Sequence, residues 1–120
     1  MKQLIGIISL LFIFSCTGNS QKLTPAQFEA KLANSNVQLV DVRTPDEFAA
    51  GTLTAAVNID FNNPNFAAEL QKLDTYKPLC IFCQKGGRSA KAHEIAKKVG
   101  FQQVIELNGG YEAWQKAKNR

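Results

Sequence analysis

The sequence lacks the residue patterns that hold metals, bind nucleic acids or cross membranes. It contains one histidine and three cysteines among 120 residues, and no arrangement of them offers the four ligands of a structural metal site. The formal net charge is only +4 and no basic cluster stands out, which argues against nucleic-acid binding. Neither an internal repeat nor a low-complexity tract occurs. The length suits one domain rather than two.

A continuous apolar run long enough to span a bilayer, about 20 residues, is also lacking. Lys2 is followed by the mostly apolar residues 4–14, which is the pattern of a secretory signal. The next residues, Ile13-Phe14-Ser15-Cys16, resemble the end of a bacterial lipoprotein signal, in which the cysteine is lipidated and becomes the first residue of the mature protein. The alternative is an ordinary cleaved signal with an incidental cysteine.

These features divide the chain into three expected parts. Residues 1–15 form a lipoprotein-type signal peptide, residues 16–21 a flexible polar tether, and residues 22–118 a single domain. The protein is therefore expected to be exported to the periplasm. Lipid on Cys16 would be its only link to a membrane, while the domain itself stays soluble.

Within the domain, apolar runs typical of strands alternate with helical patterns. The expected strands are 37–42, a segment within 55–60, 79–82 and 103–107. The expected helices are 25–33, 44–51, 66–73, 89–99 and 111–117. This alternation predicts an α/β fold with a mostly parallel central sheet flanked by helices on both faces. Ligands of such sheets bind at the carboxyl ends of the strands.

Cys83 follows the apolar strand 79–82 and begins a short loop that leads into a helix. The loop residues expected to bind an anion are Gln84, Lys85, Gly86, Gly87, Arg88 and Ser89. The glycines let the backbone curl around the sulfur, so that N–H groups and the helix dipole face it. Two basic side chains add full charges, and all of these effects lower the pKa of a thiol. The alternative is a buried structural cysteine before an ordinary glycine turn.

Three motifs in the right order resemble single-domain rhodaneses, which are sulfurtransferases. They are Cys83-x-x-Gly86-x-Arg88-Ser89, the run Leu39-Val40-Asp41-Val42-Arg43 with Glu47-Phe48 and Gly51, and Leu107-Asn108-Gly109-Gly110-Tyr111-x-x-Trp114. The resemblance covers about residues 22–118. It implies a rhodanese-like fold and a Cys83 persulfide that carries sulfur from a donor such as thiosulfate to cyanide or a thiol. The implied partners are a small sulfur-containing anion, a thiol acceptor or a persulfide-carrying protein, and no cofactor or metal is implied.

Asp41 and Arg43 end a strand at the same edge of the sheet as Cys83, where they could fix or charge the pocket or only accept and donate structural hydrogen bonds. The resemblance to rhodaneses implies that Asp41, Arg43 and Glu47 mainly support the loop. Glu47 could pair with either Arg43 or Arg88. Arg88 could bind the oxyanion of the donor, or it could tie the loop to Asp41 or Glu47. The only histidine, His93, is expected to face solvent and to play no part as a base.

Three other functions compete with sulfur transfer. Cys80-x-x-Cys83 suggests a disulfide oxidoreductase, but residues three apart on a strand point to opposite faces, so a disulfide is disfavoured. A phosphatase or arsenate reductase also uses a cysteine, an amide cradle and an arginine, but with five residues between Cys and Arg instead of the four found here. Some rhodanese-like domains that lack the cysteine are binding modules, and Cys83 argues against that function.

Overall fold

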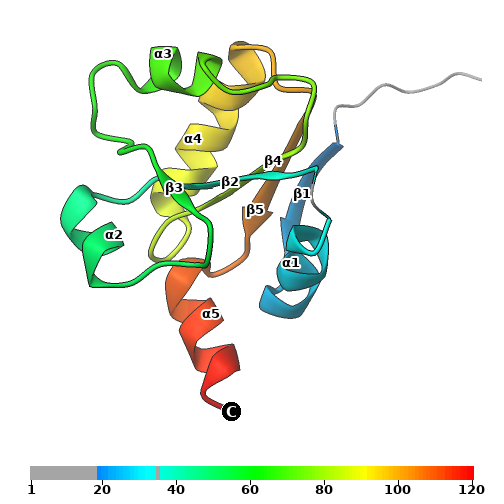
Figure 1. Ribbon diagram of the computed structural model, residues 1–120, viewed down its shortest axis with the longest axis vertical. Helices are drawn as coiled ribbons and strands as arrows, with labels where there is room; N and C mark the ends of the chain where they lie inside the picture. Colours follow the sequence, from blue (N-terminus) through cyan, green and yellow to red (C-terminus); the bar gives the residue numbers. More distant parts are fainter. Residues whose placement is uncertain (1–18, 35) are drawn as a thin grey trace, which may run out of the picture.

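The protein is organised around a five-stranded, fully parallel sheet with helices on both faces (Figure 1). The computed structural model describes residues 19–34 and 36–120, so the expected signal peptide and Cys16 lie outside the described residues. The strand order is β1-β5-β4-β2-β3. The α/β fold predicted from the sequence is therefore confirmed.

The strands are β1 (Asn19–Leu23), β2 (Gln38–Asp41), β3 (Val57–Asn58), β4 (Leu79–Phe82) and β5 (Gln103–Leu107). The helices are α1 (Pro25–Leu32), α2 (Pro45–Ala50), α3 (Phe66–Gln71), α4 (Gly87–Lys98) and α5 (Gly110–Lys118). No helix in the described part of the chain has the length and apolar character that crossing a bilayer requires.

Strand β4 lies in the middle of the sheet, and every one of its side chains is buried. It therefore shows a continuous apolar run instead of alternation, as strands covered on both faces do. Ile81 and Cys83 belong to the core cluster that includes residues of α3 and α4, whereas Cys80 and Phe82 belong to the cluster on the other face. The two cysteine side chains thus lie on opposite faces of the sheet, as their spacing predicted.

The N-terminal boundary of the fold differs from the expectation. Residues 16–21 were expected to be a tether, but Asn19–Leu23 form β1, which pairs in parallel with β5 from Asn19↔Gln103 to Leu23↔Leu107. The strand is polar and shows no apolar alternation, so its sequence pattern gave no strand signal. Pairing with the backbone of β5 holds it at the edge of the sheet, and Leu23 packs against the core.

Two helices begin with the same N-terminal capping motif, the capping box. Thr24 caps α1 and Thr44 caps α2, each followed by proline, and each exchanges hydrogen bonds with the third helical residue, Gln27 or Glu47. These reciprocal bonds satisfy N–H groups that a helix end otherwise leaves without partners. The helix α4 begins at Gly87, two residues earlier than predicted, because Gly86 turns with φ 121° and closes the loop.

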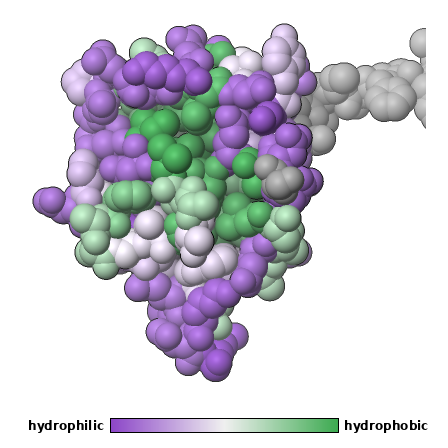
Figure 2. Space-filling model, in the orientation of Figure 1, coloured by the Kyte–Doolittle hydropathy of each residue, from purple (hydrophilic) through white to green (hydrophobic). Residues whose placement is uncertain are grey.

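The surface is hydrophilic over most of the face shown in Figure 2, including the end of α5. Apolar surface gathers in the middle of this face, in the region between α3 and β3 (Figures 1 and 2). The motifs that the sequence singled out lie elsewhere, at the carboxyl ends of β2, β4 and β5, where the loops into α2, α4 and α5 begin.

Candidate functional site

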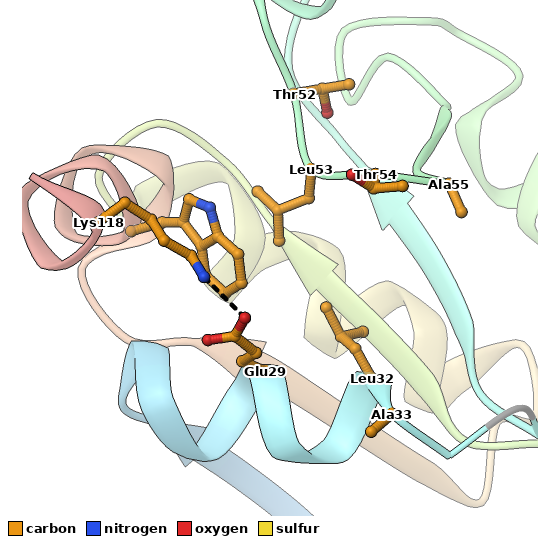
Figure 3. A pocket seen from close by; sticks show the side chains of 9 residues that line it. Glu29, Leu32, Ala33, Thr52, Leu53, Thr54, Ala55 and Lys118 are labelled. Atoms are coloured by element: carbon orange, nitrogen blue, oxygen red, sulfur yellow. Dashed lines mark hydrogen bonds and ion pairs between the residues drawn. The ribbon is translucent and has the colours of Figure 1, made fainter.

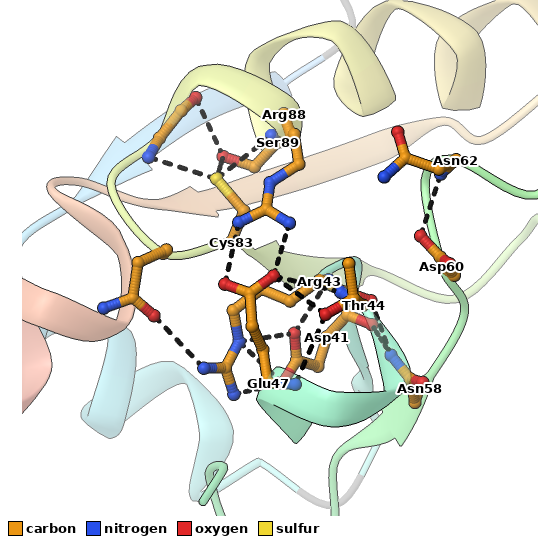
Figure 4. Close-up of polar contacts among 12 residues, drawn as sticks. Asp41, Arg43, Thr44, Glu47, Asn58, Asp60, Asn62, Cys83, Arg88 and Ser89 are labelled. Carbon is orange, nitrogen blue, oxygen red and sulfur yellow. Dashed lines mark hydrogen bonds and ion pairs between the residues drawn. The ribbon is translucent and has the colours of Figure 1, made fainter. Parts of the chain in front are cut away.

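The Cys83 sulfur lies at the N-terminus of α4, and the residue as a whole is 1% exposed. Its Sγ accepts the N–H of Gly86 at 3.1 Å and the N–H of Ser89 at 3.3 Å (Figure 4). No side chain forms a capping hydrogen bond at this helix end, so the sulfur accepts amides that a cap would otherwise satisfy. These amides and the positive end of the 12-residue helix both favour negative charge on the sulfur.

The pKa values of the two thiols near the C-terminal end of β4 are shifted in opposite directions. Burial raises the pKa of Cys83, but hydrogen bonds from the Ser89 hydroxyl and from the amides of Ser89, Gly86 and Lys85 outweigh it, so that the pKa lies below the ordinary thiol value. For Cys80, burial raises the pKa to about 11, against a weaker opposing effect of the Lys31 charge. Cys83 is therefore the more nucleophilic thiol of the two.

Arg88 pairs with Glu47 on α2, which decides between the two partners considered for Glu47. Arg88 Nη1 donates to Glu47 Oε1 at 2.7 Å and Nη2 donates to Oε2 at 3.0 Å. The hydrogen bonds from Arg88 lower the pKa of Glu47 to about 2, although burial opposes the shift. Since Glu47 also caps α2 through Thr44, this bidentate pair fixes the start of α4 against the start of α2.

Arg43 forms a buried ion pair with Asp41 and also contacts the loop. Arg43 Nη2 donates to Asp41 Oδ2 at 2.7 Å, and Nη1 donates to Gln84 Oε1 at 3.2 Å. The guanidinium also lies over the Tyr111 ring, 4.4 Å from its centroid. Residues from β2, the loop and α5 are thus joined through one side chain.

The N-terminus of α5 holds the other side of the loop. Tyr111 N–H donates to the Cys83 carbonyl at 2.8 Å, and Glu112 N–H donates to the Gln84 carbonyl at 3.0 Å. A Cβ on Gly110 would lie 2.6 Å from the Cys83 carbonyl oxygen, and Gly110 has φ 65°. The Gly-Gly-Tyr motif is thereby explained, because only glycine lets α5 approach the loop this closely.

The prediction that His93 faces solvent is wrong. His93 is 8% exposed, and its Nδ1 lies 2.7 Å from Oε2 of Glu106, which is 4% exposed. Glu106 Oε1 also accepts the Ser89 hydroxyl at 3.3 Å. Sequence reasoning missed this cluster, although Glu106 is the one charged residue in the strand pattern of 103–107. A charge in a strand covered on both faces requires a buried partner, and that signal could have found it.

Lys85 is exposed and lines a small cleft of about 160 Å³ beside the loop, together with Lys22, Gly86, Glu106 and Asn108. A larger groove of about 610 Å³ lies between α1, α5 and the segment 52–55, where Lys118 pairs with Glu29 (Figure 3). None of the residues of the Cys83 loop lines that groove. Across residues 19–34 and 36–120, His, Cys, Asp and Glu nowhere gather in the number that a metal ion requires.

Comparison with known proteins agrees with this geometry. The family described as the rhodanese-like domain matches residues 24–117. Thiosulfate sulfurtransferase GlpE of Pseudomonas aeruginosa is 33% identical over 95 residues, which are 79% of this chain and 84% of the relative. A rhodanese-like domain protein of Staphylococcus aureus is 32% identical with a TM-score of 0.68, over 80% of this chain and 90% of that one. The human single-domain sulfurtransferase TSTD1 is 25% identical with a TM-score of 0.66, over 79% and 95%.

Proposed function

The chain belongs to the rhodanese-like domain family, and from that premise we propose that it is a sulfurtransferase in which Cys83 carries the sulfur. The observation that supports this most is the Cys83 Sγ itself, which accepts two amides at the start of α4. These hydrogen bonds, with that of the Ser89 hydroxyl, hold the pKa of the thiol below its ordinary value. A thiolate formed in this way needs no further base to attack a donor.

The proposed reaction has two halves. In the first, the Cys83 thiolate attacks the outer sulfur of a donor such as thiosulfate, and the S–S bond of the donor breaks with its electron pair leaving on sulfite. Cys83 then carries a persulfide, Cys–S–S⁻. In the second half, cyanide or a thiolate attacks the terminal sulfur, and the Cys83 thiolate leaves. This is ping-pong covalent catalysis, and the chain supplies the nucleophile and the hydrogen bonds.

We assign different parts to the two cations of the loop. Arg88 is held by both oxygens of Glu47, so its main part is to brace the loop. Lys85 is exposed beside the loop, where its charge attracts an anionic donor. The partners that follow are a small sulfur-containing anion and a thiol acceptor, which could be a persulfide-carrying protein.

The test is the thiosulfate:cyanide assay on the purified, reduced protein, together with the intact mass after treatment with thiosulfate. Wild type is compared with Cys83→Ser, and Cys80→Ser is the matched control because it changes the buried thiol on the other face. Wild type and Cys80→Ser are expected to produce thiocyanate and to gain one sulfur, roughly 32 Da. Cys83→Ser is expected to do neither.

A folded, reduced wild-type protein that shows neither signal would contradict sulfur transfer from thiosulfate. The alternatives would then be tested directly. Hydrolysis of an aryl phosphate that depends on Cys83 would favour a phosphatase. Capture of a partner by the inactive Cys83→Ser protein would favour a binding module.

A further inference from the structure

Ser89 is fully buried beside the sulfur, and its hydroxyl has more acceptors than it can satisfy. Its Oγ lies 3.5 Å from Cys83 Sγ, 3.1 Å from the Gly86 carbonyl and 3.3 Å from Glu106 Oε1. A hydroxyl has one proton to donate, so these acceptors compete. When Cys83 is a thiol, its S–H donates to Ser89, and the hydroxyl proton is available to the Gly86 carbonyl and to Glu106. When Cys83 is a thiolate, the sulfur needs that same proton.

The Glu106 carboxylate is held in place from the other side by His93. Oε2 lies 2.7 Å from His93 Nδ1, while Oε1 accepts from Ser89. When Glu106 is ionised, its carboxylate can only accept, so His93 Nδ1 is the donor in that state. Ser89 and His93 are four residues apart on α4 and therefore lie on one face of the helix, toward β5. One oxygen of the Glu106 carboxylate thus contacts the His93 ring, and the other accepts from the Ser89 hydroxyl.

We propose that Glu106 and His93 are positioning residues for Cys83, and that Glu106 competes with the sulfur for the Ser89 hydroxyl. The inference rests on the proposed function, because it concerns the same sulfur. A negative charge on Cys83 and a negative charge on Glu106 then compete for the same hydrogen-bond donor, the Ser89 hydroxyl. A neutral Glu106 attracts the Ser89 hydroxyl less than a charged one does, so the hydroxyl is then shared between the sulfur and the Gly86 carbonyl.

Other charged side chains surround this unit, and they are common to every variant used below. They are Lys22 on β1, Lys85 in the loop, Arg88 on α4 with its partner Glu47 on α2, and the Asp41–Arg43 pair at the end of β2. A difference between two variants therefore reports Glu106 and Ser89 rather than this background.

The experiment measures the rate at which iodoacetamide alkylates Cys83 in the full chain between pH 5 and 9. Peptide mass spectrometry separates Cys83 from the other cysteines. Glu106→Gln keeps the shape of the side chain and removes its charge. We expect it to shift the profile to lower pH by about one unit, which is roughly tenfold faster alkylation below neutral pH. In a Ser89→Ala background, the same substitution is expected to change the rate less than about twofold.

Two outcomes would overturn the proposal. One is Glu106→Gln protein that alkylates no faster than wild type below neutral pH. The other is an equal acceleration in the Ser89→Ala background, which would show that the carboxylate acts through space and not through the hydroxyl. Alkylation needs no sulfur donor, so these results are separate from the success or failure of the sulfurtransferase assay.

A second pair of variants tests His93 and remains informative if Glu106→Gln does not fold. His93→Asn keeps a side-chain N–H near the position of Nδ1, whereas His93→Leu removes it. We expect His93→Asn to keep the wild-type profile. His93→Leu is expected to move it toward lower pH, because Glu106 is no longer held against Ser89. Coincident profiles of these two variants would contradict an orienting role for His93.

Discussion

Cys80 and Cys83 are three residues apart, yet their thiols lie in opposite surroundings. Burial alone dominates at Cys80 and raises its pKa to about 11, whereas hydrogen bonds at Cys83 outweigh burial and lower the pKa. The same residue type is therefore a thiol that stays protonated at one position and a more acidic thiol at the other. What separates them is the start of α4, whose amides reach only Cys83.

We predict that iodoacetamide near pH 7.5 modifies Cys83 and not Cys80 in the folded protein. The lowered pKa of Cys83 gives it a larger thiolate fraction at this pH than an ordinary thiol has. Cys80, with a pKa of about 11, is almost wholly protonated at the same pH. Peptide mass spectrometry would locate the label, and a sample unfolded in guanidinium is the control in which both cysteines react. Equal labelling rates in the folded protein would contradict this reading of the two thiols.

Glu47 offers a second prediction, because Arg88 lowers its pKa to about 2 in the folded state. A lowered carboxyl pKa stabilises the fold above the unfolded value of about 4.3, and that stability is lost as the pH falls through the folded value. We expect Glu47→Gln to lower the free energy of unfolding by about 1 kcal/mol near pH 7, after allowance for the partial exposure of the pair. The difference should shrink by pH 3.

Urea unfolding at several pH values would measure this difference. The control is Glu69→Gln, which removes a more exposed ion pair with Lys72 and should cost at most a few tenths of a kcal/mol. A Glu47→Gln penalty that is the same at pH 3 and pH 7 would show that the carboxylate charge does not carry the effect.

At the scale of elements, the N-termini of two helices donate hydrogen bonds to different acceptors of one loop. The start of α4 donates amides to the sulfur, and the start of α5 donates amides to the carbonyls of Cys83 and Gln84. The carbonyls are thereby satisfied away from the sulfur. The loop can then present N–H groups on one side only, which is what a negatively charged sulfur requires.

We predict that Gly110→Ala disrupts this arrangement. Its Cβ would lie 2.6 Å from the backbone of Cys83 and Gln84, at a residue with φ 65°. The expected loss is about 2 kcal/mol of unfolding free energy, together with loss of activity as the loop is displaced. Gly87→Ala is the matched control, because a Cβ there meets nothing within 4 Å. Thermal unfolding of the two variants would compare them, and equal stability would contradict the close approach of α5.

The sequence allowed most elements around the site to be predicted, because apolar strands and helix caps leave local patterns. Leu79–Phe82 and Gln103–Leu107 were predicted with the observed bounds, and the Thr24 cap was recognised from its proline and glutamine. Strand β1 could not be predicted, since a polar edge strand is held by backbone pairing with a distant segment. The charge of Glu106 within a buried strand indicated a buried partner, but the local pattern could not identify it as His93, which lies on another element.

For the molecule as a whole, we propose export and lipid attachment through Cys16, which lies outside the described residues. We predict that Cys16→Ser moves the protein from the membrane fraction to the soluble fraction of the producing bacterium, because the lipid is its only expected link to the bilayer. Cell fractionation with immunoblotting would measure it, with Cys80→Ser as the control cysteine substitution. A wild-type protein found only in the soluble fraction would contradict lipidation.

The pairing of the parallel strands shows at which end of the sheet a lipid on Cys16 would attach. Asn19 pairs with Gln103 and Leu23 with Leu107, so the chain enters β1 at the opposite edge of the sheet from Cys83. Cys16 precedes that edge by three residues, at most about 10 Å of extended chain. The thiol lies about 15 Å further along the strand direction. On the proposal of lipid attachment, the anchor would join the domain at the end of the strands opposite Cys83.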